Sequence, residues 1–358
     1  MGSAVFINGR FLTQPQSGMQ RYASCLVTAL DEVRAGQAEA DRREVTLLVP
    51  KGARALPQYR TIGVRETGML TGHGWEQTEL YWASRQGTLV SLTSTGPVLH
   101  ADHVVAMHDA AIFAKPEHFG SAYRRLHTAL RPVLAQRARQ LITISGFSRT
   151  ELARYCGVDP ERFMIIPDSA EHILHVTSEP AILARGELTP QRYFLCVGNQ
   201  SPNKNIAAAV RAFEAAELEG YELAIVGTGA AKIFGTQVAV QGRGVKTLGR
   251  VNDAELRALY ENAAGFLFPS HYEGFGVPPL EAMALGCPVI SSASSAMPEV
   301  LGDAAVYVDA DDVDGFAAAI RRMALDAGSN AGRIALGYDR SRMFSWLRGG
   351  QMLNEVLS

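Results

Sequence analysis

Two glutamates frame a glycine-bearing turn in the second half of the chain. Glu273 stands directly before Gly274, Gly276 follows two residues later, and Glu281 lies eight positions after Glu273. Glycines let the backbone come close to a ligand, and a helix that starts here would aim unpaired N–H groups outward. Such a helix start binds anions, most often phosphate. The turn is therefore a candidate phosphate site bracketed by carboxylates, although an ordinary loop and helix with surface glutamates would share the pattern.

The elements that must position this turn can be read from its flanks. Residues 265–268 are an apolar run that predicts a strand, and residues 289–292 predict a second one. Between them, two prolines suit the first turn of a helix, where a missing N–H costs nothing. Gly286 is the expected end of that helix. The sequence thus predicts strand, turn, helix and strand in succession.

A lysine follows an earlier predicted strand, residues 192–198. Lys204 lies in the loop over residues 198–205, which opens an alanine-rich helix. A lysine beside a helix start is a natural partner for a phosphate group, because the ammonium and the helix start both favour negative charge. The alternative is a solvated lysine at a helix start.

Residues 99–109 contain three histidines and two aspartates, which raises the question of a metal site. His103 and His108 span a predicted strand and need not share a side, and no H-E-x-x-H helix is present. The spacing therefore argues against a metal.

The run E-G-F-G-V-P-P-L-E-A-M-A-L-G-C-P-V-I, residues 273–290, resembles the E-x7-E motif of retaining, GT-B-fold glycosyltransferases of family 4, and among them bacterial polysaccharide-assembly mannosyltransferases. The resemblance extends over nearly the whole chain. It implies an α/β protein with two Rossmann-like domains that face a central cleft and a C-terminal helix that crosses back to the first domain.

The resemblance also implies roles for individual residues. Glu273 would touch the donor sugar, His108 would contact the same sugar, and Lys204 would stabilise the departing diphosphate; these three are the expected catalytic residues. For His108, a purely structural histidine remains the alternative. Glu281 would bind the ribose hydroxyls. The further donor-binding residues would be Gly274, Phe275, Gly276, Val277, Gly18, Asn203, Gly249, Arg250 and Val251.

The chain departs from the family pattern at two places. Family members usually carry an arginine near the loop lysine, where this chain has Asn199 and Asn203. They commonly end the last strand of the first domain with Pro-Asn-Gly, where this chain has Pro167-Asp168-Ser169. We expect less positive charge than usual around the diphosphate.

Strand and helix patterns alternate along both halves, which predicts parallel sheets. We expect a first domain over residues 1–175 that includes a closing helix over 343–358, a linker over 176–191 and a nucleotide-sugar domain over 192–342.

Ser148 and Glu151 fit a helix capping box. A G-x-G at Gly227 and Gly229 follows a predicted strand, but Lys232 replaces the third glycine of a dinucleotide fingerprint, so a nicotinamide site is not expected.

Composition limits the partners. The chain has 358 residues, 47% hydrophobic and 20% charged, which suits two soluble domains. A net charge of −2 argues against nucleic acid. The four cysteines form no C-x-x-C pair, and neither a spanning segment nor a signal peptide is recognisable. We expect a cytoplasmic protein, and peripheral contact with the inner membrane stays open.

We therefore expect a retaining glycosyltransferase that moves a sugar from a nucleotide diphosphate donor to a hydroxyl acceptor. GDP-mannose is the leading donor and a lipid-linked glycan is a candidate acceptor. No cofactor and no metal is expected, because no D-x-D motif lies at a strand end. The alternatives are a nucleotide-sugar epimerase of the same fold and a non-catalytic nucleotide-sugar-binding protein.

Overall fold

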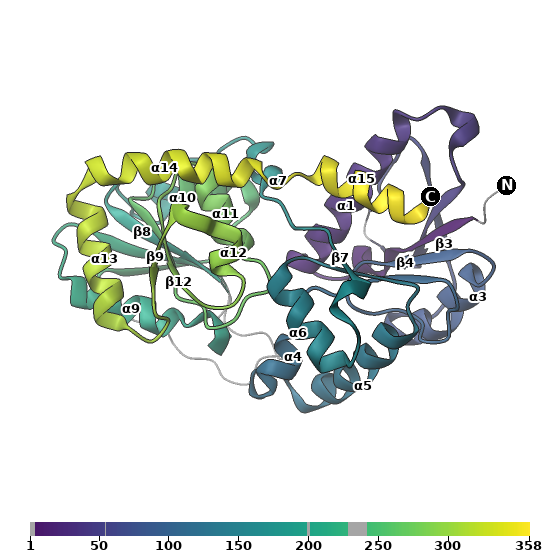
Figure 1. Ribbon diagram of the computed structural model, residues 1–358. Coiled ribbons are helices and arrows are strands. Elements are labelled where there is room, and N and C mark those ends of the chain that lie inside the picture. The colour runs from purple at the N-terminus through teal and green to yellow at the C-terminus, as the bar shows by residue number, and fades with distance from the viewer. Residues whose placement is uncertain (1–3, 54, 199–200, 228–241) are drawn as a thin grey trace. The chain divides into compact units, whose positions relative to one another are not determined.

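The computed structural model describes residues 4–53, 55–198, 201–227 and 242–358. The chain divides into two compact units. The first unit comprises Met1–Ala110, Arg125–Asp168 and Ser345–Ser358, and the second comprises Ala111–Arg124 and Ser169–Phe344. Each unit has a parallel sheet with helices against it (Figure 1).

The sheet of the first unit has seven strands in the order β3-β2-β1-β4-β5-β6-β7, and all pairs are parallel. The order reverses between β1 and β4. The strands are β1 (Val5–Asn8), β2 (Val45–Pro50), β3 (Ile62–Thr67), β4 (Thr88–Ser91), β5 (His103–Ala106), β6 (Gln140–Thr143) and β7 (Phe163–Ile165).

The helices of the first unit come from both ends of the chain. They are α1 (Gly18–Ala35), α2 (Gly72–Trp75), α3 (Tyr81–Ser84), α6 (Gly146–Cys156), α15 (Trp346–Leu357) and α5 (Ser121–Arg137), whose first four residues cluster with the second unit. The C-terminal α15 packs on α1, side by side in Figure 1. A Cβ on Gly350 would lie 2.6 Å from the Ala29 carbonyl carbon, so only glycine allows this close approach. The expected return of the last helix to the first domain is confirmed.

The second unit has six parallel strands in the order β10-β9-β8-β11-β12-β13, which reverses between β8 and β11. Its strands are β8 (Tyr193–Val197), β9 (Glu222–Val226), β10 (Val245–Gly249), β11 (Gly265–Phe268), β12 (Val289–Ser292) and β13 (Ala305–Val308). Its helices include α4 (Ala111–Ala114), α7 (Glu171–Leu174), α8 (Ala181–Arg185), α9 (Ile206–Ala216), α10 (Asp253–Asn262), α11 (Val277–Ala284), α12 (Met297–Leu301), α13 (Val313–Leu325) and α14 (Ala327–Arg342).

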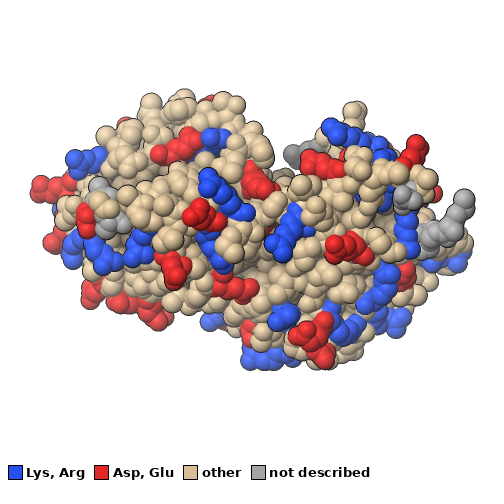
Figure 2. Space-filling model, turned by 45° about the horizontal axis from the view of Figure 1, so that its top comes forward, with Lys and Arg blue, Asp and Glu red and all other residues tan. Residues whose placement is uncertain are grey.

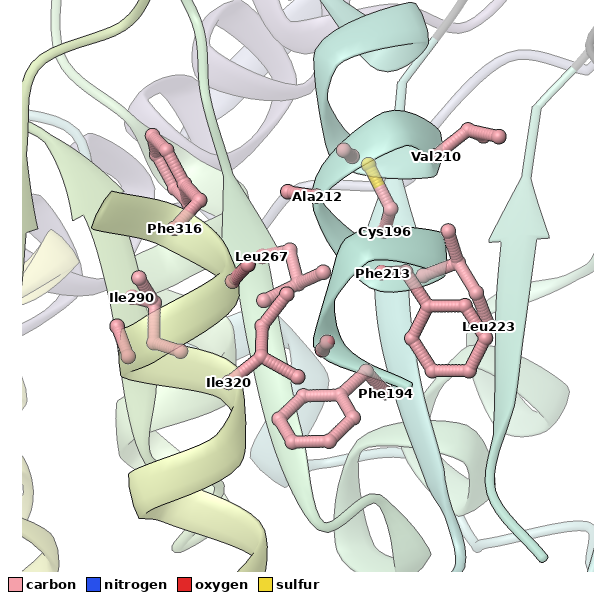
Figure 3. Close-up of a cluster of buried hydrophobic side chains, with 14 of the residues drawn as sticks. Phe194, Cys196, Val210, Ala212, Phe213, Leu223, Leu267, Ile290, Phe316 and Ile320 are labelled. Carbon is pink, nitrogen blue, oxygen red and sulfur yellow. The ribbon is translucent and has the colours of Figure 1, made fainter. Parts of the chain in front are cut away.

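Successive residues of β11 serve opposite faces of this sheet, as alternation in a strand requires. Leu267 joins the cluster formed with α9 and α13, in which Phe213 and Ile320 meet strand residues (Figure 3). Phe266 instead lies against Tyr260 of α10, with ring centroids 5.4 Å apart. Because both faces are covered, every residue of β11 is buried, which explains its continuous apolar run.

The chain passes between the units four times, at Ala110/Ala111, Arg124/Arg125, Asp168/Ser169 and Phe344/Ser345. The linker expected over residues 176–191 is instead part of the second unit, because α8 buries Ile182 and Leu183. Short elements of this kind have too few residues to show periodicity. The expected first domain over residues 1–175 likewise differs, since residues 111–124 cluster with the second unit.

Side-chain caps close the N-termini of α10 and α6. Asn252 caps α10 in a full capping box with Glu255. The box predicted for Ser148 and Glu151 is wrong, because α6 begins earlier and Ser145 is its cap, with Ser145 Oγ accepting from Ser148 N at 3.0 Å. In both cases a side-chain oxygen satisfies an N–H of the first turn.

The face drawn in Figure 2 shows Lys and Arg side chains interspersed with Asp and Glu, as the small net charge implies. Over the described ranges, no helix is both long and apolar enough to cross a membrane.

Candidate active site

The loops after β8 and β11 form the candidate site of the second unit. These strands are neighbours, but the chain leaves β8 toward β9 and leaves β11 toward β12. At such a reversal the following loops diverge and leave a crevice at the carboxyl ends of the strands, where open α/β sheets bind ligands. Lys204 lies in the first of these loops and Glu273 in the second.

The structure brings Lys204 and Glu273 together. Lys204 Nζ donates to Glu273 Oε1 at 2.7 Å, and the two side chains are 20% and 13% exposed. The ammonium also lies 5.4 Å from the centroid of the Phe268 ring, at the end of β11. A cation is therefore held at the carboxyl end of the sheet, with a carboxylate as its present partner.

Asn203 ties the two loops to each other. Its carbonyl accepts from His271 N at 2.8 Å, and its side-chain Nδ2 donates to Tyr272 O at 3.3 Å. Ser201 Oγ donates to the Asn203 amide oxygen at 2.6 Å. An arginine at this position could not accept the bond from Ser201, because a guanidinium has no acceptor. Asn199 lies outside the described residues.

The glycine turn leads into α11 as predicted. Gly276 is the residue before the helix, with φ +100°, and a Cβ there would lie 2.5 Å from Met297 Cε. The left-handed conformation therefore favours glycine, and any side chain here would also have to displace the end of the Met297 side chain. Phe275 beside it is buried and meets the ring of Phe344 edge to face, with centroids 5.2 Å apart. Val277 is the first helical residue, and Gly274 is buried in the turn.

Glu281, on α11, is buried and hydrogen-bonded at both carboxylate oxygens. His172 Nε2 lies 2.7 Å from Oε1, and Tyr260 OH donates to Oε2 at 3.0 Å. Burial, together with the neighbouring Glu281, raises the pKa of Tyr260 well above its ordinary value, so its hydroxyl keeps the proton that it donates. The sequence analysis did not find His172 or Tyr260. Neither stands in a motif, and only the fold places them beside Glu281.

Gly249 is the last residue of β10, and Arg250 and Val251 follow it, at the same edge of the sheet as the loops above but separated from β8 by β9. Gly249 has φ +70°, and its carbonyl accepts from Gly227 N at 2.8 Å. The Arg250 side chain is exposed.

His108 belongs to the first unit, just after β5. It is buried, its Nε2 donates to Leu92 O at 2.9 Å, and its ring meets Tyr22 edge to face at 4.7 Å. Burial lowers its pKa, so the ring is neutral near pH 7. These contacts fit a structural histidine whose hydrogen bond is made within the protein, and they equally fit a neutral histidine that bonds a ligand.

The other two histidines of that stretch have separate protein contacts. His100 Nε2 lies 3.1 Å from Ser84 O, and His103 Nε2 lies 2.9 Å from Ser91 Oγ. Among the described residues, no three His, Cys, Asp or Glu side chains gather as a metal site would need.

Gly18 is the first residue of α1, after Ser17. Its φ is not positive, and a Cβ would meet nothing within 4 Å. The protein backbone therefore does not require glycine at this position.

A buried polar network that the sequence analysis missed lies at the β1/β4 reversal of the first unit. Glu76, fully buried, accepts from Arg10 Nη1 at 2.6 Å, from Asn8 Nδ2 at 2.9 Å and from Thr95 Oγ1 at 2.9 Å. His73 Nδ1 lies 3.0 Å from Glu76 Oε2, the oxygen that also accepts from Arg10. Glu76 begins a π-helical turn, Glu76–Leu80, a feature frequent at functional sites. Its residues are scattered over the sequence, so no local pattern announced it.

The geometry can be set beside known proteins. Residues 191–326 match the family Glycosyl transferases group 1. The O-antigen chain mannosyltransferase B of Escherichia coli is 33% identical over 267 residues, which cover 70% of each chain. The O-antigen chain mannosyltransferase RfbU of Salmonella typhimurium is 29% identical over 256 residues, 70% of this chain and 69% of that one.

The fold is similar to that of WaaG, a glycosyltransferase involved in lipopolysaccharide biosynthesis. The TM-score is 0.71 at 15% identity, with 99% of each chain covered. Two parallel-sheet α/β units of this kind define a GT-B glycosyltransferase fold, as expected. The chain belongs to the glycosyl transferases group 1 family.

Proposed function

We propose that the protein is a retaining mannosyltransferase that transfers mannose from GDP-mannose to a hydroxyl of a growing bacterial polysaccharide. The Lys204–Glu273 pair at the β8/β11 reversal carries the proposal, because it combines a cation for a diphosphate with a carboxylate for a sugar. The family supports sugar transfer, and the mannosyltransferase names of the two relatives favour mannose and polysaccharide assembly.

The donor would be bound by residues of the second unit. Glu281 would accept hydrogen bonds from the ribose hydroxyls, and the N–H groups at the start of α11 would face the diphosphate. Lys204 would turn from Glu273 toward the phosphate oxygens and stabilise the charge that grows on them. Glu273 would then stabilise positive charge at the anomeric carbon.

The reaction would be a front-face displacement. The acceptor oxygen forms a bond to the anomeric carbon while the bond from that carbon to the phosphate oxygen breaks. The acceptor proton passes to the departing phosphate oxygen, so GDP leaves as the product. His108, neutral through burial, would act as a hydrogen-bonding group toward the donor sugar rather than as a proton carrier.

The test is acceptor-dependent release of nucleotide from GDP-mannose, with UDP-glucose, UDP-galactose and dTDP-rhamnose as comparison donors. Free and lipid-linked mannose-terminated oligosaccharides serve as acceptors, and NMR of the product gives the anomeric configuration. We expect transfer from GDP-mannose with an α-linkage. A β-linkage would refute retention. Donor conversion without any acceptor would indicate an epimerase, and binding without turnover a nucleotide-sugar-binding protein.

We also propose that no metal takes part, because Lys204 and the amides of the α11 start would neutralise the diphosphate. Excess EDTA should leave the transfer rate within about twofold of the untreated enzyme. Loss of most activity that Mn²⁺ restores would overturn this part of the proposal.

A further inference from the structure

Both oxygens of Glu281 are held by side chains to which no function has been assigned. His172 Nε2 lies 2.7 Å from Oε1, and Tyr260 OH lies 3.0 Å from Oε2. The two donors come from different elements, α7 and α10, and Glu281 lies on α11. All three belong to the second unit.

These contacts are shielded from water. The side chains of His172 and Glu281 are 9% and 7% exposed, and Tyr260 is fully buried. Only the tautomer with its proton on Nε2 can donate to the carboxylate. The Tyr260 ring is also fixed by Phe266, 5.4 Å away. Both hydrogen bonds to the carboxylate are therefore protected from competition by solvent.

The two donors fix the plane of the Glu281 carboxylate but do not occupy all of its lone pairs. Each carboxylate oxygen has two lone pairs, and each of the two donors occupies only one of them. One lone pair on each oxygen is left to accept a further hydrogen bond. A vicinal diol can donate two hydrogen bonds to such a carboxylate at once.

We propose that His172 and Tyr260 are positioning residues that hold Glu281 for recognition of the ribose diol of the donor. This inference rests on the proposed function. Without either donor the Glu281 side chain gains rotamer freedom, and a bound diol must then order it at a cost in affinity. His172 and Tyr260 would thereby set the preference for a ribonucleotide.

The test combines variants with a ligand change. Calorimetry measures the Kd of GDP and of 2′,3′-dideoxy-GDP for the wild type, His172→Phe and Tyr260→Phe. Phenylalanine keeps a ring of similar size but cannot donate. We expect each variant to bind GDP about 10-fold more weakly, as for one lost charge-assisted hydrogen bond, and dideoxy-GDP within about twofold of the wild type.

His172→Gln is the conservative variant, because its amide can still donate, and it should recover most of the GDP affinity. His175→Phe is the matched control, since His175 lies next to α7 and is exposed. Differential scanning calorimetry shows whether each variant is folded. If His172→Phe proves unfolded, Tyr260→Phe and His172→Gln still decide the question.

The outcomes separate the inference from the function on which it rests. An equal loss for GDP and dideoxy-GDP, or no loss for either, overturns the positioning role. Wild type that binds both ligands equally overturns diol recognition by Glu281 and the inference with it. Wild type that does not bind GDP refutes the proposed function itself.

Discussion

The two glutamates of the E-x7-E stretch have different surroundings. Glu273 is paired with Lys204 alone among the contacts described above, whereas both oxygens of Glu281 are held by ring-borne donors, His172 and Tyr260. A carboxylate that has to follow a change in charge needs freedom to exchange partners. A carboxylate that recognises an unchanging part of a ligand benefits from being fixed.

This difference predicts different kinetic effects. Glu281→Gln should raise the donor KM and change kcat little, because ribose is bound equally in the ground and transition states. Glu273→Gln should lower kcat about 100-fold or more, because positive charge at the anomeric carbon develops only in the transition state. Donor-saturation kinetics on folded variants measure both.

Glu261→Gln is the control for these substitutions, because Glu261 is a partly exposed glutamate of the same unit that pairs with Arg257. It should leave both constants unchanged. If Glu273→Gln changes only KM and Glu281→Gln abolishes kcat, the two roles are exchanged.

The buried Glu76 predicts a pH-dependent stability of the first unit. Burial alone would raise the pKa of Glu76, but the hydrogen bond with His73, the charge of Arg10 and the hydrogen bond from Asn8 outweigh it and hold the pKa below its ordinary value. The carboxylate therefore stabilises the fold fully above its unfolded pKa of about 4.3, and the contribution is lost as pH falls through the lower folded pKa.

Glu76→Gln should lower the melting temperature of the first unit by roughly 6–12 °C at pH 7, since breaking a buried ion pair costs about 3 kcal/mol. Calorimetry from pH 8 to pH 3 should show this gap constant down to about pH 5 and closing below it. Glu161→Gln, which removes an 82% exposed carboxylate, should show no gap. A gap that persists unchanged at pH 3 would contradict the assignment.

At the scale of elements, the glycine turn before α11 packs against Phe344, at the last of the four crossovers of the chain. Phe275 packs on Phe344, the last residue of the second unit, and Phe344 O accepts from Ser169 Oγ at 3.0 Å. Ser169 is the first residue after the third crossover. The turn is thus supported by residues at the last two of the four places where the chain passes between units.

Phe344→Leu should therefore disturb the glycine turn while it leaves Lys204 and Glu281 in place. The edge-to-face contact is worth about 0.5–1.5 kcal/mol, so we expect the affinity for GDP to fall about 2- to 10-fold by calorimetry. Met343→Ala is the neighbouring control, because Met343 is 61% exposed. An unchanged Kd for Phe344→Leu would mean that the turn does not depend on this contact.

At the scale of the whole molecule, each unit has its own sheet and its own polar cluster at the reversal of strand order. The Lys204–Glu273 pair and Glu281 belong to the second unit, and the Glu76 network belongs to the first. A nucleotide diphosphate should therefore contact the second unit chiefly, through the loops after β8 and β11.

Hydrogen–deuterium exchange with GDP tests this division. At about 100 times its Kd, a ligand stabilises the state that binds it by about 2.7 kcal/mol, equal to about a 100-fold slowing of exchange that needs unfolding. We expect protection over residues 201–206 and 269–281 and little change in β1, β2 and β3. Guanosine, which lacks the diphosphate, is the control. Protection confined to the first unit would place the donor there instead.

The amino-acid sequence by itself determined the elements around the glycine turn before α11. Residues 265–268 and 289–292 are strands, as predicted. The helix α11 begins after Gly276 and ends shortly before Gly286, which has φ +75°. These features are local, because apolar runs, helix-starting prolines and left-handed glycines act through residues a few positions away. The GT-B fold was predicted from the family resemblance that residues 273–290 carry.

Only the tertiary structure decided which side chains meet. Lys204 and Glu273 are 69 positions apart, and His172 and Glu281 are 109 apart. Arg10 and Glu76 meet across 66 positions. The extent of each unit was decided in the same way, since α8 joins the second unit through burial of Ile182 and Leu183. Such pairings depend on strand order and on which face each helix covers, and these are long-range properties that no local pattern of residues specifies.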